Sequence, residues 1–140
     1  MDLQKIHKIY FVGIGGIGMS ASAGIAREAG FEVTGSDSKA LYAPSKDVLD
    51  TYDIEHFIGY DEKNIIDHPA DLYVLSAGED LVNPEVAYII EHDLTYVSFP
   101  ELLYELSKDR LRIVVAGTHG KSTTAALLGT LLSEIDDSSY

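Results

Sequence analysis

The 140-residue chain contains no cysteine, which excludes disulfide bonds and thiolate metal sites. Basic residues are scarce: 10 lysines and arginines stand against 23 aspartates and glutamates, and the net charge is −13. This charge argues against nucleic acid or an anionic membrane as a partner, although backbone N–H groups can still bind an anionic small ligand. The five histidines lack the spacing of a metal site. No run of residues resembles a signal peptide or a membrane span, so we expect a cytoplasmic protein.

What the sequence does contain is a regular alternation of apolar runs with helix-like segments. Hydrophobic residues make up 46% of the chain, enough for a globular core. Because strands with one buried face would alternate, continuous apolar runs indicate strands that helices cover on both sides. We predict an α/β fold, a Rossmann-like parallel sheet with helices on both faces. The predicted strands are residues 9–12, 72–75 and 113–116, with weaker candidates at 31–34, 55–58 and 95–97.

Three segments carry helix signals. Ile17, Ala21 and Ile25 form an apolar stripe with i, i+4 spacing. Asn83 followed by Pro84 is typical of an N-cap and a first helical residue, and residues 98–101 have capping-box spacing. A charged stretch near residue 108, followed by a new strand, predicts a domain boundary between residues 107 and 108.

A glycine-rich loop follows the first predicted strand and precedes a helix, which is the context that a diphosphate-binding motif requires. The first glycine of the G-x-G-x-x-G spacing permits a tight turn, the second lets the backbone approach a diphosphate, and the third allows close packing of helix and strand. NAD, FAD and UDP-sugars all carry a diphosphate, so the ligand stays open, and a turn that only packs a helix is the simpler alternative. The loop reads Gly13-Ile14-Gly15-Gly16-Ile17-Gly18.

Two polar residues follow other predicted strands. Asp37 stands where an acidic residue of a Rossmann fold contacts a ribose hydroxyl, or it caps the next turn. Ser76 follows the strand at residues 72–75, at the sheet edge where open α/β sheets bind ligands.

A second glycine-rich loop follows the strand predicted at residues 113–116 and precedes a helix predicted at 124–132. Its N–H groups would cradle phosphates, Lys121 would neutralise the β- and γ-phosphate oxygens, and Ser122 would offer its hydroxyl to Mg²⁺. Two such loops, about a hundred residues apart, predict two nucleotide ligands on two domains. The loop departs from the general P-loop because only two residues separate its glycines: Gly117-Thr118-His119-Gly120-Lys121-Ser122-Thr123.

In order and spacing these motifs resemble the Mur ligases. The resemblance rests on residues 13–20, 35–37, 83–85 and 117–123, and it extends from about residue 8 to residue 132. Because it has a histidine at position 119, the second loop resembles that of the branch that joins L-alanine to UDP-N-acetylmuramate. Ser122 stands where that branch commonly has threonine, a change that keeps the hydroxyl.

The resemblance implies an ATP-dependent ligase of peptidoglycan precursor synthesis. Residues 1–107 would form a UDP-sugar-binding domain, and residues 108–140 would begin a central ATP-binding domain with its first strand, phosphate loop and helix. ATP would phosphorylate the muramyl carboxylate, and the amine of L-alanine would attack the acyl phosphate. The implied UDP-sugar-binding residues are Gly13, Gly15, Gly16, Ile17, Gly18, Asp37 and Ser76. The implied ATP-binding residues are Gly117, Thr118, His119, Gly120, Lys121, Ser122 and Thr123, with Lys121 and Ser122 as catalytic candidates and Ser122 as the Mg²⁺ ligand.

Two alternatives stay open. A recycling ligase that attaches a tripeptide to the same UDP-sugar is similar in both loops, although the intact run at residues 13–20 favours the alanine branch. An NAD-binding Rossmann module would also explain the first loop and Asp37. The 140 residues include no second acidic Mg²⁺ site, adenine pocket or amino-acid domain. We therefore expect the chain alone to bind UDP-sugar weakly and to lack ligase activity.

Overall fold

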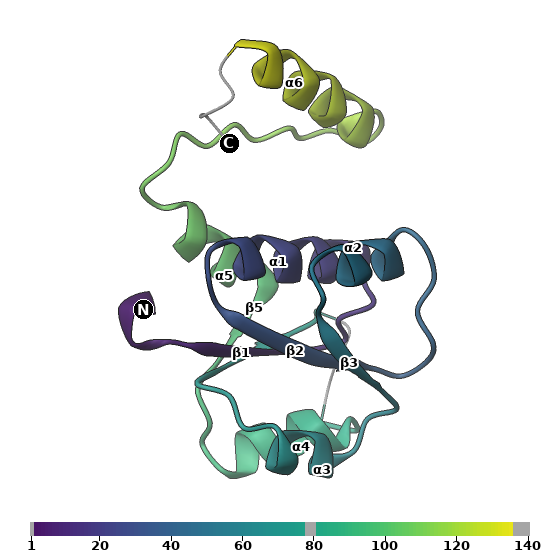
Figure 1. Cartoon of the computed structure of the whole chain (residues 1–140), viewed down its shortest axis with the longest axis vertical. Helices are drawn as coiled ribbons and strands as arrows, with labels where there is room; N and C mark the ends of the chain where they lie inside the picture. Colours follow the sequence, from purple (N-terminus) through teal and green to yellow (C-terminus); the bar gives the residue numbers. More distant parts are fainter. Residues whose placement is uncertain (1, 78–80, 136–140) are drawn as a thin grey trace. The chain divides into compact units, whose positions relative to one another are not determined.

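The computed structural model describes residues 2–77 and 81–135 and divides into two compact units, Met1–Asp109 and Arg110–Tyr140. The first unit contains a parallel sheet with the strand order β3-β2-β1-β4-β5, which is the order of a doubly wound Rossmann sheet (Figure 1). The predicted fold class is confirmed. The strands are β1 (Lys8–Val12), β2 (Glu32–Asp37), β3 (Glu55–Ile58), β4 (Leu72–Leu75) and β5 (Tyr96–Ser98).

Helices cover both faces of this sheet. α1 (Ile17–Glu28), α2 (Ser45–Thr51) and α5 (Phe99–Ser107) lie on one face, and α3 (Glu62–Asp67) and α4 (Pro84–Glu91) lie on the other (Figure 1). A short 3₁₀ helix, η1 (Leu3–Lys5), precedes β1. The predicted caps are present: the Asn83 side chain accepts the N–H of Glu85, and the Glu101 carboxylate accepts the N–H of Ser98 at 2.8 Å.

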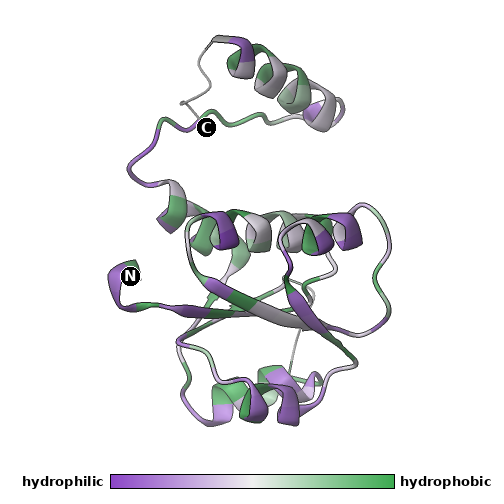
Figure 2. Ribbon diagram, in the orientation of Figure 1, coloured by the Kyte–Doolittle hydropathy of each residue, from purple (hydrophilic) through white to green (hydrophobic). Residues whose placement is uncertain are grey.

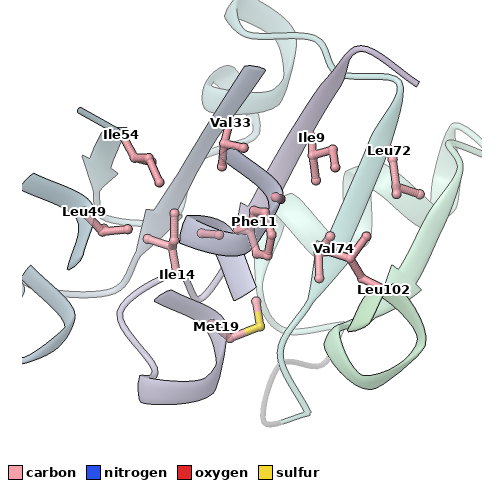
Figure 3. Packing of buried hydrophobic residues seen from close by; sticks show 12 residues of the cluster. Ile9, Phe11, Ile14, Met19, Val33, Leu49, Ile54, Leu72, Val74 and Leu102 are labelled. Carbon is pink, nitrogen blue, oxygen red and sulfur yellow. The ribbon is translucent and has the colours of Figure 1, made fainter. Parts of the chain in front are cut away.

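Strand β1 shows why the apolar runs are continuous. Ile9 and Phe11 point into the core under α1, α2 and α5, as Figure 3 shows, whereas Tyr10 and Val12 point into the core under α3 and α4. All four side chains are almost fully buried. Burial of such a side chain contributes about 1.5–3 kcal/mol, so both faces of the central strand stabilise the sheet.

The predicted inward stripe of α1 is wrong. Ile17 is 71% exposed and Ile25 is 45% exposed, and the buried face instead carries Met19, Ala23 and Ala26. Beside α2 this face is tightly flanked and carries small residues: an added Cβ at Gly24 would lie 2.8 Å from the ring of Tyr52, just after α2. Close packing thus outweighs side-chain hydrophobicity in setting the helix orientation.

The second unit differs from expectation in one element. Residues 111–117 form no strand, although they are largely hydrophobic (Figure 2). A strand requires a hydrogen-bonded neighbour, and no other strand lies within the described residues of this unit, 110–135. The helix after the second glycine loop is present as α6 (Lys121–Ile135). No helix in the described ranges has the length and hydropathy to cross a membrane.

Candidate functional site

The first glycine loop, residues 13–16, is anchored to the carboxyl end of β2. The N–H groups of Gly13 and Ile14 both donate to the carbonyl oxygen of Ser36, each at 2.9 Å. Gly13 has φ +81°, a conformation that favours glycine, and the Ile14 side chain is fully buried. The loop position is therefore set by β2 as much as by β1, the strand that precedes it.

A close approach beneath this loop depends on Gly35, to which the sequence assigned no packing role. At Gly35, in β2, an added Cβ would lie 2.5 Å from the carbonyl oxygen of Phe11 and 2.9 Å from Cδ1 of Ile14. The motif assigned close helix–strand packing to Gly18. In the structure an added Cβ at Gly18 would instead meet the ring of Phe99 in α5, at 3.3 Å. The close approach at Gly35 thus involves β2, the end of β1 and the loop.

Asp37 reaches back from the end of β2 to the glycine loop. Its Oδ2 accepts the N–H of Gly15 at 2.8 Å, and its Oδ1 lies 3.4 Å from the N–H of Lys39. In this structure Asp37 therefore caps the Gly15 amide of the glycine loop and only approaches the Lys39 N–H of the next turn, and its contact with a ribose stays a prediction. The Gly15 amide is not the bare donor that the motif suggested, because the Asp37 carboxylate occupies it.

The N-terminus of α1 keeps the donors that the glycine loop was predicted to supply. Gly16 is the N-cap and no side chain caps the helix. Within the described part of the chain, the N–H groups of Ile17, Gly18 and Met19 donate no hydrogen bond. Free N–H groups in the first helical turn, together with the helix dipole, favour an anion.

These features meet in a pocket of about 370 Å³ at the carboxyl edge of the sheet. The pocket is lined by the glycine loop and α1 at residues 15–17, by Asp37, and by the segment of residues 39–45 that connects β2 to α2. Two of its side chains, Ile17 and Tyr42, are 71% and 72% exposed. Sequence reasoning missed the 39–45 segment because it carries no motif, and only the fold brings it beside the loop.

A larger pocket, of about 730 Å³, lies toward the amino ends of β2 and β3. Four carboxylates and one arginine are among the residues that line it, so its charge disfavours a phosphate ligand. Open α/β sheets bind ligands at the carboxyl ends of strands, and we therefore place the site at the smaller pocket. The ionisable residues that line the larger one are Arg27, Glu32, Asp50, Asp53, Glu55 and His56.

Ser76 lies directly after β4 and is half-buried. Its N–H donates to the carbonyl oxygen of Val12 at 3.3 Å, which places it beside the end of β1. Between β1 and β4 the strand order reverses, so Ser76 is at the topological switch point, although it does not line the 370 Å³ pocket.

The second glycine loop is exposed and is organised around Lys121, the first residue of α6. Lys121 Nζ donates to the carbonyl oxygen of Gly117 at 2.7 Å, and His119 Nδ1 lies 3.3 Å from the hydroxyl oxygen of Thr118. Gly120 has φ +74°, which favours glycine. The lysine side chain thus lies against the loop backbone at the start of the helix. No group of three or more His, Asp or Glu side chains in the described ranges could hold a metal ion.

Comparison with known proteins gives matching results at three levels. A family model described as Mur ligase family, catalytic domain, matches residues 8–111. A UDP-N-acetylmuramate–L-alanine ligase of Psychrobacter sp. (strain PRwf-1) is 39% identical over 133 residues, which are 95% of this chain and 27% of that protein.

Two solved structures share the fold. The UDP-N-acetylmuramate:L-alanyl-γ-D-glutamyl-meso-diaminopimelate ligase of Neisseria meningitides is 36% identical with a TM-score of 0.83, over 91% of this chain and 40% of that one. The UDP-N-acetylmuramate–alanine ligase of Thermotoga maritima is 28% identical with a TM-score of 0.82, over 91% and 29%. The chain therefore spans between about a quarter and two-fifths of the length of these relatives.

Proposed function

Because the chain belongs to the Mur ligase family, we propose that it serves an ATP-dependent ligase of peptidoglycan precursor synthesis. In this proposal the first unit binds the UDP end of UDP-N-acetylmuramate, and the second unit contributes the phosphate loop for ATP. The single observation that carries the proposal is the 370 Å³ pocket, where the uncapped N-terminus of α1 meets the carboxyl end of β2. The ligase would work in the cytoplasm, with L-alanine as its third substrate.

The diphosphate would lie against the free N–H groups of Ile17 and Gly18. The helix dipole and the donors together stabilise negative charge there without a basic side chain, which suits a chain of net charge −13. Gly13, Gly15 and Gly16 would let the backbone approach the ligand. Asp37 already accepts the Gly15 N–H, so we assign it to hold the loop and to face the nucleoside, with the diphosphate placed on α1. Ser76 is the candidate contact on the β4 side.

The second loop would bind the triphosphate of ATP. Amides of residues 117–123 would surround the phosphate oxygens, and Lys121 would leave the Gly117 carbonyl to neutralise the β/γ oxygens. Mg²⁺, when bound, shields the charge of the transferred phosphoryl group. The Ser122 hydroxyl is an oxygen ligand of the kind that Mg²⁺ takes alongside phosphate oxygens and water, so the residue fits the ion.

The proposed reaction has two steps. A carboxylate oxygen of the muramyl group attacks the γ-phosphorus of ATP, ADP leaves, and an acyl phosphate forms. The amine of L-alanine then attacks the acyl carbon, loses a proton, and expels inorganic phosphate through a tetrahedral intermediate. The chain's own residues contribute positioning and charge neutralisation, which are the main requirements of phosphoryl transfer.

A second candidate is the ligase that attaches a tripeptide to the same sugar nucleotide. It is favoured by identity to the solved structures, which is 36% for the tripeptide ligase and 28% for the alanine ligase. The 39% identity to a curated alanine ligase and the intact run at residues 13–20 favour alanine. Phosphate release by a full-length protein with this sequence, measured with alanine and with the tripeptide in turn, separates the two.

The pocket assignment is tested most sharply at Gly16. An added Cβ there meets nothing closer than Met19 Cγ at 3.6 Å, which is ordinary van der Waals contact, so we expect substitutions at this position to fold. Gly16→Glu would place a negative charge against the diphosphate, whereas Gly16→Gln has the same size and no charge. We expect Gly16→Glu to weaken UDP-N-acetylmuramate binding about tenfold or more relative to Gly16→Gln in calorimetric titrations. Equal affinities of the two variants would refute the assignment. Gly15→Val is a poorer test, because its Cβ would collide with Leu41 and Asp37.

A further inference from the structure

A fully buried carboxylate lies behind the glycine loop on the opposite face of the sheet. Glu85, in the first turn of α4, is 0% exposed. Its Oε1 accepts from Asn64 Nδ2 at 2.7 Å, from the Asp61 N–H at 3.3 Å and from the Tyr10 hydroxyl at 3.4 Å. Its Oε2 accepts from the Ser36 hydroxyl. All four of these partners are donors, and none carries a positive charge.

Burial raises the pKa of the Glu85 carboxyl, because a desolvated carboxylate is disfavoured, while the hydrogen bonds from Ser36 and Asn64 oppose this shift. Burial likewise raises the pKa of the Tyr10 hydroxyl, which therefore stays a donor. Packing alone does not require such a group, since an apolar side chain of similar volume would avoid the desolvation cost. The buried carboxylate keeps its hydrogen bonds only when all of its donors are in place, so the complete network fixes the positions of those donors.

Ser36 links this network to the pocket. Its hydroxyl donates to Glu85, and its carbonyl oxygen accepts the N–H groups of Gly13 and Ile14. The next residue, Asp37, accepts the Gly15 N–H and lines the pocket. We propose that Glu85 is a positioning residue for the nucleotide pocket, which holds the end of β2 and, through it, the glycine loop. The identity of the ligand as a UDP-sugar rests on the proposed function.

The test compares Glu85→Gln with Ile89→Val. The glutamine has the same shape, but its NH₂ group cannot accept a hydrogen bond. Opposite Asn64 it would set a donor against a donor, and opposite Ser36 it would force the hydroxyl to accept where it now donates. Ile89 is fully buried on the same helix and belongs to the apolar core, so its truncation to valine lowers stability without removing a hydrogen-bonding group from the network. We expect Glu85→Gln to weaken UDP-N-acetylmuramate binding about tenfold. This is the lower end of the loss seen at metal sites when a residue that hydrogen-bonds to a metal ligand is replaced. Ile89→Val is expected to bind as the wild type does.

The pattern of amide hydrogen exchange distinguishes a local loss of positioning from a general loss of stability. Glu85→Gln should raise exchange at Gly13, Ile14 and Gly15 more than elsewhere in the sheet, because these amides bond to Ser36 and Asp37. Uniform exchange, or affinity that matches Ile89→Val, would overturn the positioning role. If Glu85→Gln does not fold, Ser36→Ala decides, since it removes the hydroxyl, keeps the carbonyl and should show the same local pattern. A wild-type chain that binds no UDP-sugar would instead refute the proposed function, while the exchange comparison still tests the positioning.

Discussion

Replacement of Gly35 with alanine perturbs the packing beneath the glycine loop directly. The new Cβ would lie 2.5 Å from the carbonyl oxygen of Phe11, a backbone atom that cannot rotate away. Overpacking of a core costs about 1–3 kcal/mol, and alanine in place of glycine recovers about 0.5–1 kcal/mol of backbone entropy. Because the clash involves backbone, we expect a loss of about 1–2 kcal/mol in the free energy of unfolding.

Urea unfolding followed by circular dichroism measures this loss, with Gly18→Ala as the control. An added Cβ at Gly18 would lie 3.3 Å from the ring of Phe99, a side chain that can yield, and the helix gains about 1 kcal/mol from alanine. Gly18→Ala should therefore match or exceed the wild-type stability. If Gly35→Ala unfolds at the same urea concentration as the wild type, the close approach of loop and strand described above is wrong.

Three further predictions concern helix packing, pH and the second loop. Gly24→Ala should lower the thermal midpoint, because its Cβ would lie 2.8 Å from the ring of Tyr52, and Tyr52→Ala in the same chain should relieve that clash. Two backbone N–H groups, of Lys8 and His7, bond to the Asp71 carboxylate and lower its pKa. Its contribution to stability is therefore present above the ordinary pKa of about 4 and is lost as pH falls through the lowered value. In Asp71→Asn the free energy of unfolding should change less with pH in that range. In a full-length protein with this sequence, Lys121→Ala should abolish ATP binding at the second loop and leave UDP-N-acetylmuramate affinity unchanged in parallel titrations.

The fold class was predictable because strands of a parallel sheet that are buried on both faces have continuous apolar runs in the sequence. The runs at residues 9–12 and 72–75 form the adjacent central strands β1 and β4, and Asn83 and Ser98 cap helices as their spacing predicted. These features depend on neighbours within a few residues, or on burial that acts on a whole segment.

The errors arose where distant residues decide the outcome. α1 turns its isoleucines outward, and on its buried side the ring of Tyr52, from a distant segment, crowds the backbone at Gly24. Residues 113–116 have the composition of a strand, but a strand also needs a neighbour. Asp37 bonds to Gly15, 22 residues away, a contact that neither of its two predicted roles included.

Neither the hydrogen-bond network of Glu85 nor the role of residues 39–45 in the pocket could be predicted from the sequence. Glu85 follows a capping asparagine and a proline, and it looked like an ordinary first-turn glutamate. Only the sheet brings Ser36 and Tyr10 to its carboxylate. The segment at residues 39–45 lines the pocket without any motif, and its role follows from where β2 ends.

Calorimetric titration of the chain with UDP-N-acetylmuramate and, separately, with NADH tests the central claim most directly. Both ligands carry a diphosphate that suits a glycine loop, and they differ in the rest of the molecule. We predict saturable binding of UDP-N-acetylmuramate, with NADH at least about tenfold weaker. Tighter binding of NADH would contradict the assignment of the pocket to a sugar nucleotide.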